Sequence, residues 1–510
     1  MTPFSLPRAR RLPALSTLCG ALAAALLLSA CTAGPDYQRP AYQDVPLHNV
    51  GLLQQRTAGA PMPALDHWWD GFNDPALSEI IRRVLAQNLD LSAALARVEQ
   101  ARAAARVAGA RRLPEGDLSG QAARARQSLQ SPLGEIARTF PGYQRTQNLF
   151  ELDGGASWEL DLAGALKRGA QAADAELEAA EAQHAGVRIS VAAEAADAYF
   201  RIRGAQARIA LAEHQVKASA DLGEIVRLRL KDGLASVAET AQADARLAQS
   251  RAALPPLRTE LERHLNRLDV LMGTAPGTYA GQLAQGADAS QVPAISVSQS
   301  SVELMRRRPD VIAAERKLAA SNERIGQAMA AWYPDLSLSA LVGFQSLGAA
   351  GFLSADSLQA QGGLGLRWRL FDFGRIDAEI DRAKGAHAEA LAVYRKSMLQ
   401  AAEDVENAIM ALVQLEQQSR DLNAEVDAQQ LARSNAEEAY KGGVLSLAEV
   451  LTQDRLLLAA QDEMAQVHAD NARAAVSVFR ALGGWMVMSW PCVDFLRRTV
   501  AAVVCAAGCT

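Results

Sequence analysis

The segment Lys441–Leu457, KGGVLSLAEVLTQDRLL, is present a second time in this chain. Moving back by 210 positions gives Lys231–Leu247, KDGLASVAETAQADARL, in which the lysine, the second glycine, the serine, one alanine, the glutamate, the aspartate and the final leucine coincide. The same offset pairs Trp158 with Trp368. Because the two copies keep this register over more than a hundred residues, the sequence predicts one structural unit built twice.

The composition favours long helices and argues against nucleic acid as a partner. Only 5% of the 510 residues are aromatic and alanine is abundant, which suits closely packed helices. The formal net charge of -5 includes Arg8, Arg10 and Arg11, and without these three arginines it is -8. A chain with this charge has no electrostatic attraction for nucleic acid.

The beginning of the chain has the order of an export signal: a basic segment, an apolar run and then a cysteine. Leu28–Cys31, LSAC, resembles the bacterial lipoprotein box, which predicts a signal peptide over residues 1–30 and a lipid-bearing Cys31. Thr32 at the next position resembles lipoproteins that are sent on to the outer membrane. An ordinary secretory signal with an incidental cysteine is the alternative. Residues 31–65 are rich in proline and polar residues and are expected to be an extended, lipidated segment.

Helical periodicity dominates both copies of the repeat. Two long helices are predicted over 164–231 and 374–441, and each spans roughly 100 Å at 1.5 Å per residue. Return helices are predicted over 236–272 and 446–482, at roughly 55 Å each. Pro255 and Pro256 are expected to kink the first return helix.

Each copy also begins with a shorter helix, over 77–112 and 297–332, and these two are related by an offset of 220. One short helix placed end to end with one return helix matches the length of one long helix. This match predicts a helical cylinder whose far end is a glycine turn, at Gly233 and Gly443. The predicted segments are repeat 1 (66–280), a linker (281–296), repeat 2 (297–485) and a C-terminal tail (486–510).

Between the helices of each copy the period changes to strict alternation, which indicates strands. The clearest runs are 336–344 and 358–370, where one face has no charge. The first copy has weaker runs near 118–128, which includes two arginines, and over 151–160. The expected hairpins cover about 115–162 and about 335–371.

Strands of about ten residues cross a bilayer when tilted, whereas no internal stretch has the 18 or so apolar residues of a spanning helix. Trp158 and Trp368 end the second strand of each hairpin and are expected to be anchors at the membrane interface. An open sheet edge in lipid leaves backbone groups unpaired, so a chain with four membrane strands must oligomerise, and three chains would supply twelve. The alternative is a pair of amphipathic hairpins that rest on a soluble core.

Three stretches together point to one family. They are the start Cys31–Pro40, CTAGPDYQRP; the block Arg306–Val311, RRRPDV, with Ala313–Arg316; and the duplicated glycine turn. From about Leu12 to Trp485 the chain resembles the TolC-like outer-membrane factors, and among them the NodT-type lipoproteins of tripartite efflux systems.

The resemblance implies a mainly α chain with membrane β-hairpins and a trimeric TolC-like α/β barrel. In this fold a 12-stranded outer-membrane β-barrel, with four strands per chain, continues into a long periplasmic α-helical tunnel. The implied partners are two further copies of the chain, a periplasmic adaptor, an inner-membrane pump of the RND type and outer-membrane lipid.

The resemblance also implies a gate at the periplasmic end of the tunnel. Family members close this end with rings of acidic side chains just after the second glycine turn, and those positions fall at Glu449 and Thr452. The acid is retained at the first and missing at the second, with Asp454 two residues further on.

Helix capping is an alternative role for the same stretch. Ser446 with Glu449 fits the capping box, and so does Ser236 with Glu239 in the first copy. Because both copies carry the pattern, capping and gating both remain open for Glu449.

Two stretches depart from the family pattern. Asp161–Ala165 reads DLAGA, where members usually carry phenylalanine before the glycine and arginine after it, whereas Phe373–Arg375 keeps that version. Met486–Thr510 contains three cysteines and resembles nothing in the family. With no histidine near these cysteines, the tail is interpreted as a disordered or spurious extension and not as a metal site.

Patterns typical of enzymes are absent from the sequence. The seven histidines show no i, i+4 zinc pair, and Gly362–Gly365 lacks the spacing of a dinucleotide loop. There is no P-loop and no nucleophile elbow. No catalytic residue, cofactor or metal is therefore expected.

Three functions are consistent with these patterns. The first is an outer-membrane efflux duct that passively exports small toxic compounds together with a pump and an adaptor. The second is a type I protein-secretion duct of the same fold, and the third is a lipid-anchored periplasmic coiled-coil scaffold. A water-filled tunnel selects weakly, so the sequence does not identify the exported compound.

Overall fold

The computed structural model describes residues 32–41, 46–56, 65–283, 292–295 and 301–483. The predicted signal peptide, Cys31, much of the linker and the tail over 486–510 lie outside the described residues. The chain divides into two compact units. Unit 1 contains 97–180, 314–394 and the segment that ends at Pro40, and unit 2 contains 41–96, 181–313 and the chain from 395 onward. Each unit therefore combines parts of both copies of the repeat.

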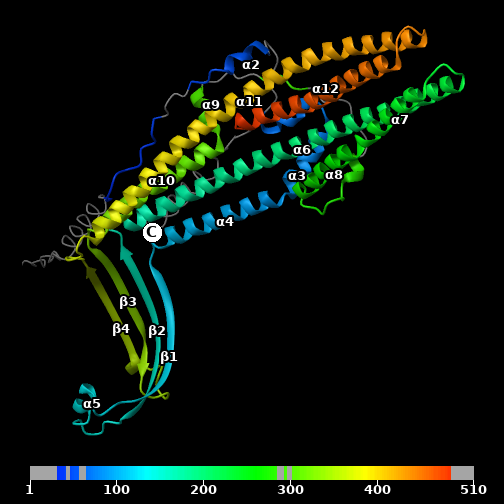
Figure 1. Ribbon diagram of the computed structural model, residues 1–510. Coiled ribbons are helices and arrows are strands. Elements are labelled where there is room, and N and C mark those ends of the chain that lie inside the picture. Colours follow the sequence, from blue (N-terminus) through cyan, green and yellow to red (C-terminus); the bar gives the residue numbers. More distant parts are fainter. Residues whose placement is uncertain (1–31, 42–45, 57–64, 284–291, 296–300, 484–510) are drawn as a thin grey trace, which may run out of the picture. The chain divides into compact units, whose positions relative to one another are not determined.

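Unit 1 contains an antiparallel sheet of four strands in the order β1-β2-β3-β4 (Figure 1). All four predicted strands are present. The first lies closer to the N-terminus than the predicted 118–128, because residues from Glu115 onward already pair with the next strand. The strands are β1 Glu115–Arg126, β2 Thr146–Leu160, β3 Asp335–Ser346 and β4 Leu358–Arg367.

The loops at the far end of the sheet contain two short helices that the sequence did not predict, α5 (Pro132–Ala137) and the 3-10 helix η3 (Ala355–Ser357). The side chain of Ser131 caps α5 by accepting a hydrogen bond from Gly134 N at 3.2 Å, and Pro132 occupies the first turn. A helix of six residues is too short to give a periodic signal.

The register of the sheet repeats as the sequence does. Adding 220 to a residue of β1 and 210 to its partner in β2 converts the pair Glu115–Ser157 into Asp335–Arg367, which is a β3–β4 pair. The β2–β3 pairing then joins the two copies within the chain. The sequence repeat is therefore also a repeat of strand pairing.

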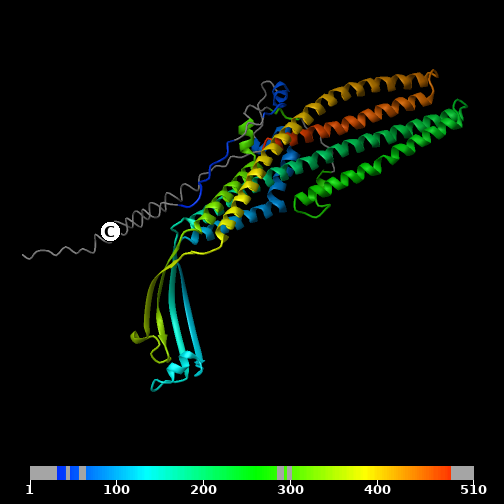
Figure 2. The same ribbon diagram turned by 60° about the vertical axis from the view of Figure 1, so that its left-hand side comes forward.

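The two long helices are α6 (Ala165–Lys231) and α11 (Arg375–Lys441), of 67 residues each, as predicted. Figure 2 shows each of them turning back at its far end into a return helix. Gly233 and Gly443 make the turns with φ of 73° and 75°, a conformation that costs little only for glycine.

The predicted helices over 77–112 and 297–332 are each broken once, so these predictions were wrong in one respect. Pro309 explains the second break, because a proline disfavours helical geometry at the residue before it. In the first copy no proline is present, and the side chain of Asn88 starts the next helix by accepting from Leu91 N at 2.9 Å. The resulting helices are α3 Pro75–Gln87, α4 Leu89–Ala110, α9 Ser301–Arg307 and α10 Pro309–Ala330.

The two breaks make equivalent contacts in unit 2. Asn88 Nδ2 donates to Leu271 O at 2.9 Å, and Arg308 Nη1 donates to Ala481 O at 2.8 Å. The two donors, Asn88 and Arg308, are 220 positions apart, and the two acceptors, Leu271 and Ala481, are 210 positions apart. The hydrogen bond is therefore present in both copies of the repeat, although its donor is an amide in the first and a guanidinium in the second. Arg308, from the RRRPDV block, is buried and is also paired with Asp310 at 2.8 Å.

The first return helix is broken and the second is continuous. The break falls at Ala253, just before the two prolines, which confirms the predicted kink. The core of unit 2 contains a stacked pair, Trp68 and Phe479, with ring centroids 5.4 Å apart. The remaining elements are α7 Val237–Ala252, α8 Leu254–Leu271, α12 Leu447–Ala481, α2 Val50–Arg56, η1 Leu65–Phe72 and η2 Ala280–Leu283. Of the helices in the described ranges, none combines the length and the hydropathy needed to span a bilayer.

Candidate functional site

The two faces of the sheet differ in polarity. Pairing places the even-numbered residues of all four strands on one face, where Leu118, Leu338 and Leu364 are exposed. The odd-numbered face carries acidic and basic side chains, namely Glu115, Asp117, Glu151, Asp153, Glu159, Asp335 and Arg367. A sheet with one apolar and one polar face suits a wall between lipid and water.

Arg124 and Arg126, which weakened the prediction of the first strand, are the exceptions on the apolar face. They pair with Asn148 and Thr146, at the loop end of the sheet. Polar side chains therefore gather at one end of this face, and the apolar band extends from there toward the helices.

The predicted interface anchors make equivalent hydrogen bonds in the two copies. Trp158 Nε1 donates to Arg112 O and Trp368 Nε1 donates to Trp332 O, both at 3.0 Å. Each indole thus links the base of a strand to the end of the helix that precedes the hairpin. The rings remain 37% and 55% exposed, which leaves apolar surface at the base of the sheet.

The segment Thr32–Pro40, called the strap below, is held in unit 1 by Arg168 at the start of α6. The Arg168 guanidinium is 3% exposed, and it donates to Glu323 at 2.7 Å, to Asp36 at 2.9 Å and to the carbonyls of Ala33 and Gly34 at 3.2 Å. Burial works to lower the pKa of Arg168, but the two carboxylates outweigh it and hold the pKa above its ordinary value.

A second buried charge holds the other end of the strap. Glu315, which is fully buried, accepts hydrogen bonds from Tyr37 and from Arg39 at 3.0 Å, and it is paired with Arg316 at 2.6 Å. Burial raises the pKa of the Glu315 carboxyl, but the bonds from Arg39, Tyr37 and Arg316 outweigh it and the pKa is lowered. Gly34 lies so close to Gly326 of α10 that a Cβ on either residue would clash with the backbone opposite.

Sequence reasoning missed Arg168, Glu315 and Glu323 as residues that matter. Arg168 lies 132 positions from Asp36, and Glu315 lies 278 positions from Tyr37, so no periodicity connects them to the strap. The only available signal was the charge and aromatic content of the GPDYQR stretch, together with the AAER block that contains Glu315.

Both predicted capping pairs are in contact in the structure. Glu239 accepts from Ser236 N at 2.6 Å while Glu239 N donates to Ser236 Oγ at 3.2 Å, which is a complete capping box. In the second copy the Glu449 carboxylate accepts from Ser446 N at 2.9 Å and from Ser446 Oγ at 3.0 Å. The side chain of Glu449 is exposed at the start of α12.

The other two predicted gate residues have partners within unit 2. Thr452 Oγ1 donates to Ala448 O at 2.8 Å. Asp454, whose side chain is 13% exposed, is paired with Arg246 at 3.1 Å, and it accepts a hydrogen bond from Gln215 at 2.6 Å. Its carboxylate charge is therefore compensated inside the chain, which distinguishes it from the exposed Glu449.

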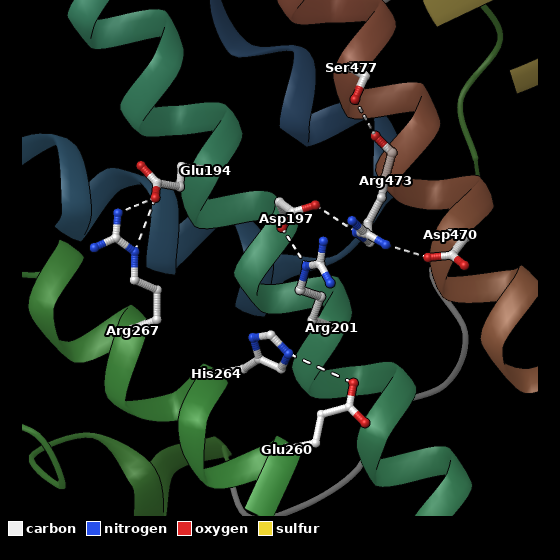
Figure 3. Close-up of polar contacts among 9 residues, drawn as sticks. All are labelled: Glu194, Asp197, Arg201, Glu260, His264, Arg267, Asp470, Arg473 and Ser477. Carbon is white, nitrogen blue, oxygen red and sulfur yellow. Dashed lines mark hydrogen bonds and ion pairs between the residues drawn. The ribbon is translucent and has the colours of Figure 1, made fainter. Parts of the chain in front are cut away.

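Figure 3 shows a further charged cluster in unit 2, where α6, α8 and α12 meet. Asp197 accepts from Arg201 at 2.7 Å and from Arg473 at 2.6 Å. His264 lies 3.9 Å from Glu260. Burial of its imidazole ring lowers the pKa of the ring, and the positive charges of Arg201 and Arg263 lower it further. The carboxylates Glu194 and Asp197 face guanidinium groups, so the cluster ties the three helices together. In the described part of the chain no group of three or more His, Cys, Asp or Glu side chains is arranged to hold a metal ion.

Comparison with known proteins agrees with this geometry. The model of the outer membrane efflux protein family matches residues 80–274 and 301–484. The pyoverdine export outer membrane protein OpmQ of Pseudomonas aeruginosa is 30% identical over 91% of this chain and 96% of its own length. Nodulation protein T of Rhizobium leguminosarum bv. trifolii is 28% identical over 90% of this chain and 95% of its own length.

The solved structure of the outer-membrane channel OprN superposes with a TM-score of 0.80 at 30% identity, over 89% of this chain and 99% of that one. The shared architecture confirms the predicted fold class, a mainly helical chain with membrane β-hairpins of the TolC-like type.

Proposed function

Because this chain belongs to the outer membrane efflux protein family, we propose that it forms the exit duct of a tripartite pump for small toxic compounds. The family consists of outer-membrane channels and not of enzymes, and its members extend from the outer membrane into the periplasm. The observation that supports the proposal most is the sheet, whose apolar face suits lipid while its polar face suits a water-filled passage.

The duct requires more than one chain. Among the described residues the outer edges of β1 and β4 are unpaired, and open edges in lipid are costly because each unpaired backbone group has no water to bond. Three copies would supply twelve strands and close the wall. The proposed partners outside the membrane are a periplasmic adaptor and an inner-membrane pump of the RND type.

Lipidation at Cys31 is part of this proposal. The strap supports it, because Ala33 N donates to Ala163 O at 2.8 Å and Thr32 packs on Gly164, just after the end of β2. The residue that follows Cys31 therefore lies at the base of the membrane sheet, next to the interface where Trp158 is proposed to anchor. Labelled palmitate should enter the wild-type chain and not Cys31→Ser, and equal labelling of both would exclude this site.

Glu449 is the proposed gate residue, since its charge is exposed while that of Asp454 is compensated. The repeat offers a matched control, because Glu239 caps α7 as Glu449 caps α12. Glu449→Ala and Glu239→Ala each remove the N3 carboxylate of a capping box and should therefore lose similar stability. Only Glu449→Ala should raise single-channel conductance in planar bilayers, and equal conductance in the two variants would leave capping as the sole role.

The same recordings test the duct itself. Purified protein reconstituted in planar bilayers is expected to give discrete conductance steps, at least in the Glu449→Ala variant. Absence of conductance in the wild type and in both variants, from samples that retain their oligomeric state in detergent, would contradict the proposed function.

A further inference from the structure

Two arginines interrupt the apolar face of the sheet. Charged side chains occur on the odd-numbered face of every strand, whereas Arg124 and Arg126 are the only charged strand residues on the even-numbered face. Both are exposed, and within the described residues neither has an ion pair. Any anionic partner of these two cations therefore lies outside the described chain.

The depth of the two arginines follows from the length of β2. Arg124 is paired with Asn148, which lies ten residues from Trp158 at the base of the sheet. At about 3.3 Å per residue this is roughly 33 Å along the strand, or roughly 25 Å along the membrane normal for a tilt of about 40°. The apolar band of an outer-membrane sheet is also about 25 Å tall. With Trp158 at one interface, Arg124 and Arg126 thus lie at the opposite one.

This opposite interface is the outer one. Members of the family extend from the outer membrane into the periplasm, so the end of the sheet remote from the helices faces outward. Figure 1 shows the β1–β2 loop, with α5, at that end. An arginine in the middle of the apolar band would be costly, whereas at the interface its guanidinium can reach the lipid headgroups.

The second copy of the repeat shows that the fold does not require these arginines. The positions equivalent to Arg124 and Arg126 are Phe344 and Ser346, and Phe344 is paired with Leu358 just as Arg124 is paired with Asn148. The same register therefore accommodates an apolar pair. The arginines are not explained by the needs of the sheet.

The loop of the first hairpin adds to the positive charge. Residues 124–146 contain four arginines and one glutamate, a net charge of +3, whereas the equivalent residues 344–356 contain one aspartate and no basic residue, a net charge of -1. The whole chain has a net charge of -5. The outer end of the first hairpin is thus a positive region on an acidic protein, which favours an anionic partner.

We propose that Arg124 and Arg126 bind phosphate groups of the phosphorylated glycolipid in the outer leaflet of the outer membrane. The proposal rests on the proposed function, because it assumes that the sheet crosses this membrane with its loops outward. Guanidinium groups suit phosphate because their planar donors form bidentate, charge-assisted hydrogen bonds. The two arginines are next neighbours on one face of β1, roughly 7 Å apart along the strand, so both reach the same layer of headgroups.

The repeat supplies the variant that tests this site. Arg124→Phe with Arg126→Ser gives the outer end of β1 the residues that β3 has at the equivalent positions, so the double variant is expected to fold and to conduct. Native mass spectrometry of delipidated protein in detergent, titrated with diphosphoryl lipid A, measures the affinity. The double variant should bind about tenfold more weakly or worse, because one hydrogen bond to a charged group accounts for about that factor.

Arg367→Ser is the matched control for loss of charge. Arg367 is an exposed strand arginine as well, but it lies on the odd-numbered face and is paired with Asp335 at 3.1 Å. This variant should retain the wild-type affinity for diphosphoryl lipid A. An equal loss in Arg367→Ser and in the double variant would show that overall charge, and not the site on the apolar face, determines binding.

The chemistry of the probe separates the possible sources of phosphate. Lipid A without its phosphates should bind the wild type and the double variant alike, and inorganic phosphate should not displace diphosphoryl lipid A. Phosphatidylglycerol that binds as tightly as lipid A and depends equally on the arginines would overturn the assignment to glycolipid.

Two further outcomes distinguish this proposal from the proposed function. Equal affinity of the wild type and the double variant for diphosphoryl lipid A, in protein that conducts in planar bilayers, would overturn the lipid site and leave the duct intact; the arginines would then be merely hydrated. Absence of conductance in the wild type and in the Glu449→Ala variant would instead contradict the duct, and with it the orientation on which this site depends.

Discussion

The two strand-to-helix connections of unit 1 are equivalent in the repeat, but of the segments that the structure describes, one covers the first connection and none covers the second. After β2, Gly164 is buried beneath Thr32 of the strap, and Ala163 O accepts from Ala33 N at 2.8 Å. After β4, Phe371 and Phe373 are 88% and 101% exposed, and Phe373 holds a φ of 54°.

The difference shows that equivalent positions of a sequence repeat need not be equally stabilised. The strap occurs once in the chain and can cover one connection only. A non-glycine residue in the left-handed region costs about 1–2 kcal/mol. The first connection is thus stabilised by contacts within the chain, whereas the second combines exposed apolar surface with backbone strain.

Removal of the Arg168 guanidinium should have the largest effect, because it would abolish the cover of the first connection. Arg168→Ala leaves the Glu323 side chain, 9% exposed, without its cation and releases Asp36. Breaking a buried ion pair by removing one partner costs about 3–5 kcal/mol. We expect a loss of this size in the free energy of unfolding and faster proteolysis within the strap.

The second connection provides the control for this prediction. Arg375 begins the other long helix, is exposed, and lies 3.9 Å from Glu379. Arg375→Ala should change the free energy of unfolding by less than about 0.5 kcal/mol. If both variants lose the same stability, the strap does not distinguish the two connections.

Glu315→Gln should have the next largest effect, since the buried carboxylate accepts bonds from Tyr37, Arg39 and Arg316. Hydrogen bonds to charged groups contribute about 1.5–3 kcal/mol, and we expect a loss of that order near neutral pH. Thermal unfolding of the wild type and of Glu315→Gln in detergent measures this loss of stability.

The same substitution should change the pH dependence of stability. The pKa of Glu315 is lowered in the folded chain from its ordinary value of 4.5, so the unfolded chain takes up the proton first as the pH falls. The stabilisation is therefore complete above about pH 4.5 and is lost as the pH falls through the folded pKa. The difference in the free energy of unfolding between the wild type and Glu315→Gln should therefore decrease below about pH 4.5. A difference that stays constant with pH would contradict the lowered pKa of Glu315.

Phe373→Gly should have the smallest effect, and its sign is opposite. Glycine relieves about 1–2 kcal/mol of left-handed strain and costs about 0.5–1 kcal/mol of chain entropy, so the variant should be more stable by about 0.5–1 kcal/mol. Phe371→Gly is the matched control, because Phe371 is similarly exposed without a positive φ. It should not gain stability, and a gain in both variants would show that removal of an aromatic ring, and not relief of strain, is responsible.

Local patterns in the sequence were sufficient for the existence of the four strands and for the ends of the long helices, but not for every strand end: β4 ends at Arg367, three residues before the predicted run does. Alternation over 336–344 and 358–370 predicted β3 and β4, and Gly233 and Gly443 predicted the far turns. These signals succeed because each depends on neighbouring residues alone. The break at Asn88 was missed because an asparagine inside a helical pattern gives no warning equal to a proline.

The contacts of the charged residues could not be predicted in the same way. Asp454 was expected near a gate, but in the structure it is paired with Arg246, 208 positions away. The strap was expected to be extended, yet nothing local indicated that Arg168 and Glu315 would hold it. Such pairings depend on which helices the fold places side by side, which the pattern of one segment does not determine.

The contact between Gly34 and Gly326 fixes the position of the strap along α10. Because neither position has room for a side chain, moving the strap along α10 by one residue would bring Ala33 or Pro35 into the same space. The strap can therefore lie against α10 in one alignment only, the one that places Gly34 opposite Gly326. Three peptide units separate Gly34 from Cys31, and an extended chain of that length reaches about 10 Å. The acyl group that we propose on Cys31 would therefore lie within about 10 Å of Gly34, so the glycine pair limits the depth of the proposed anchor.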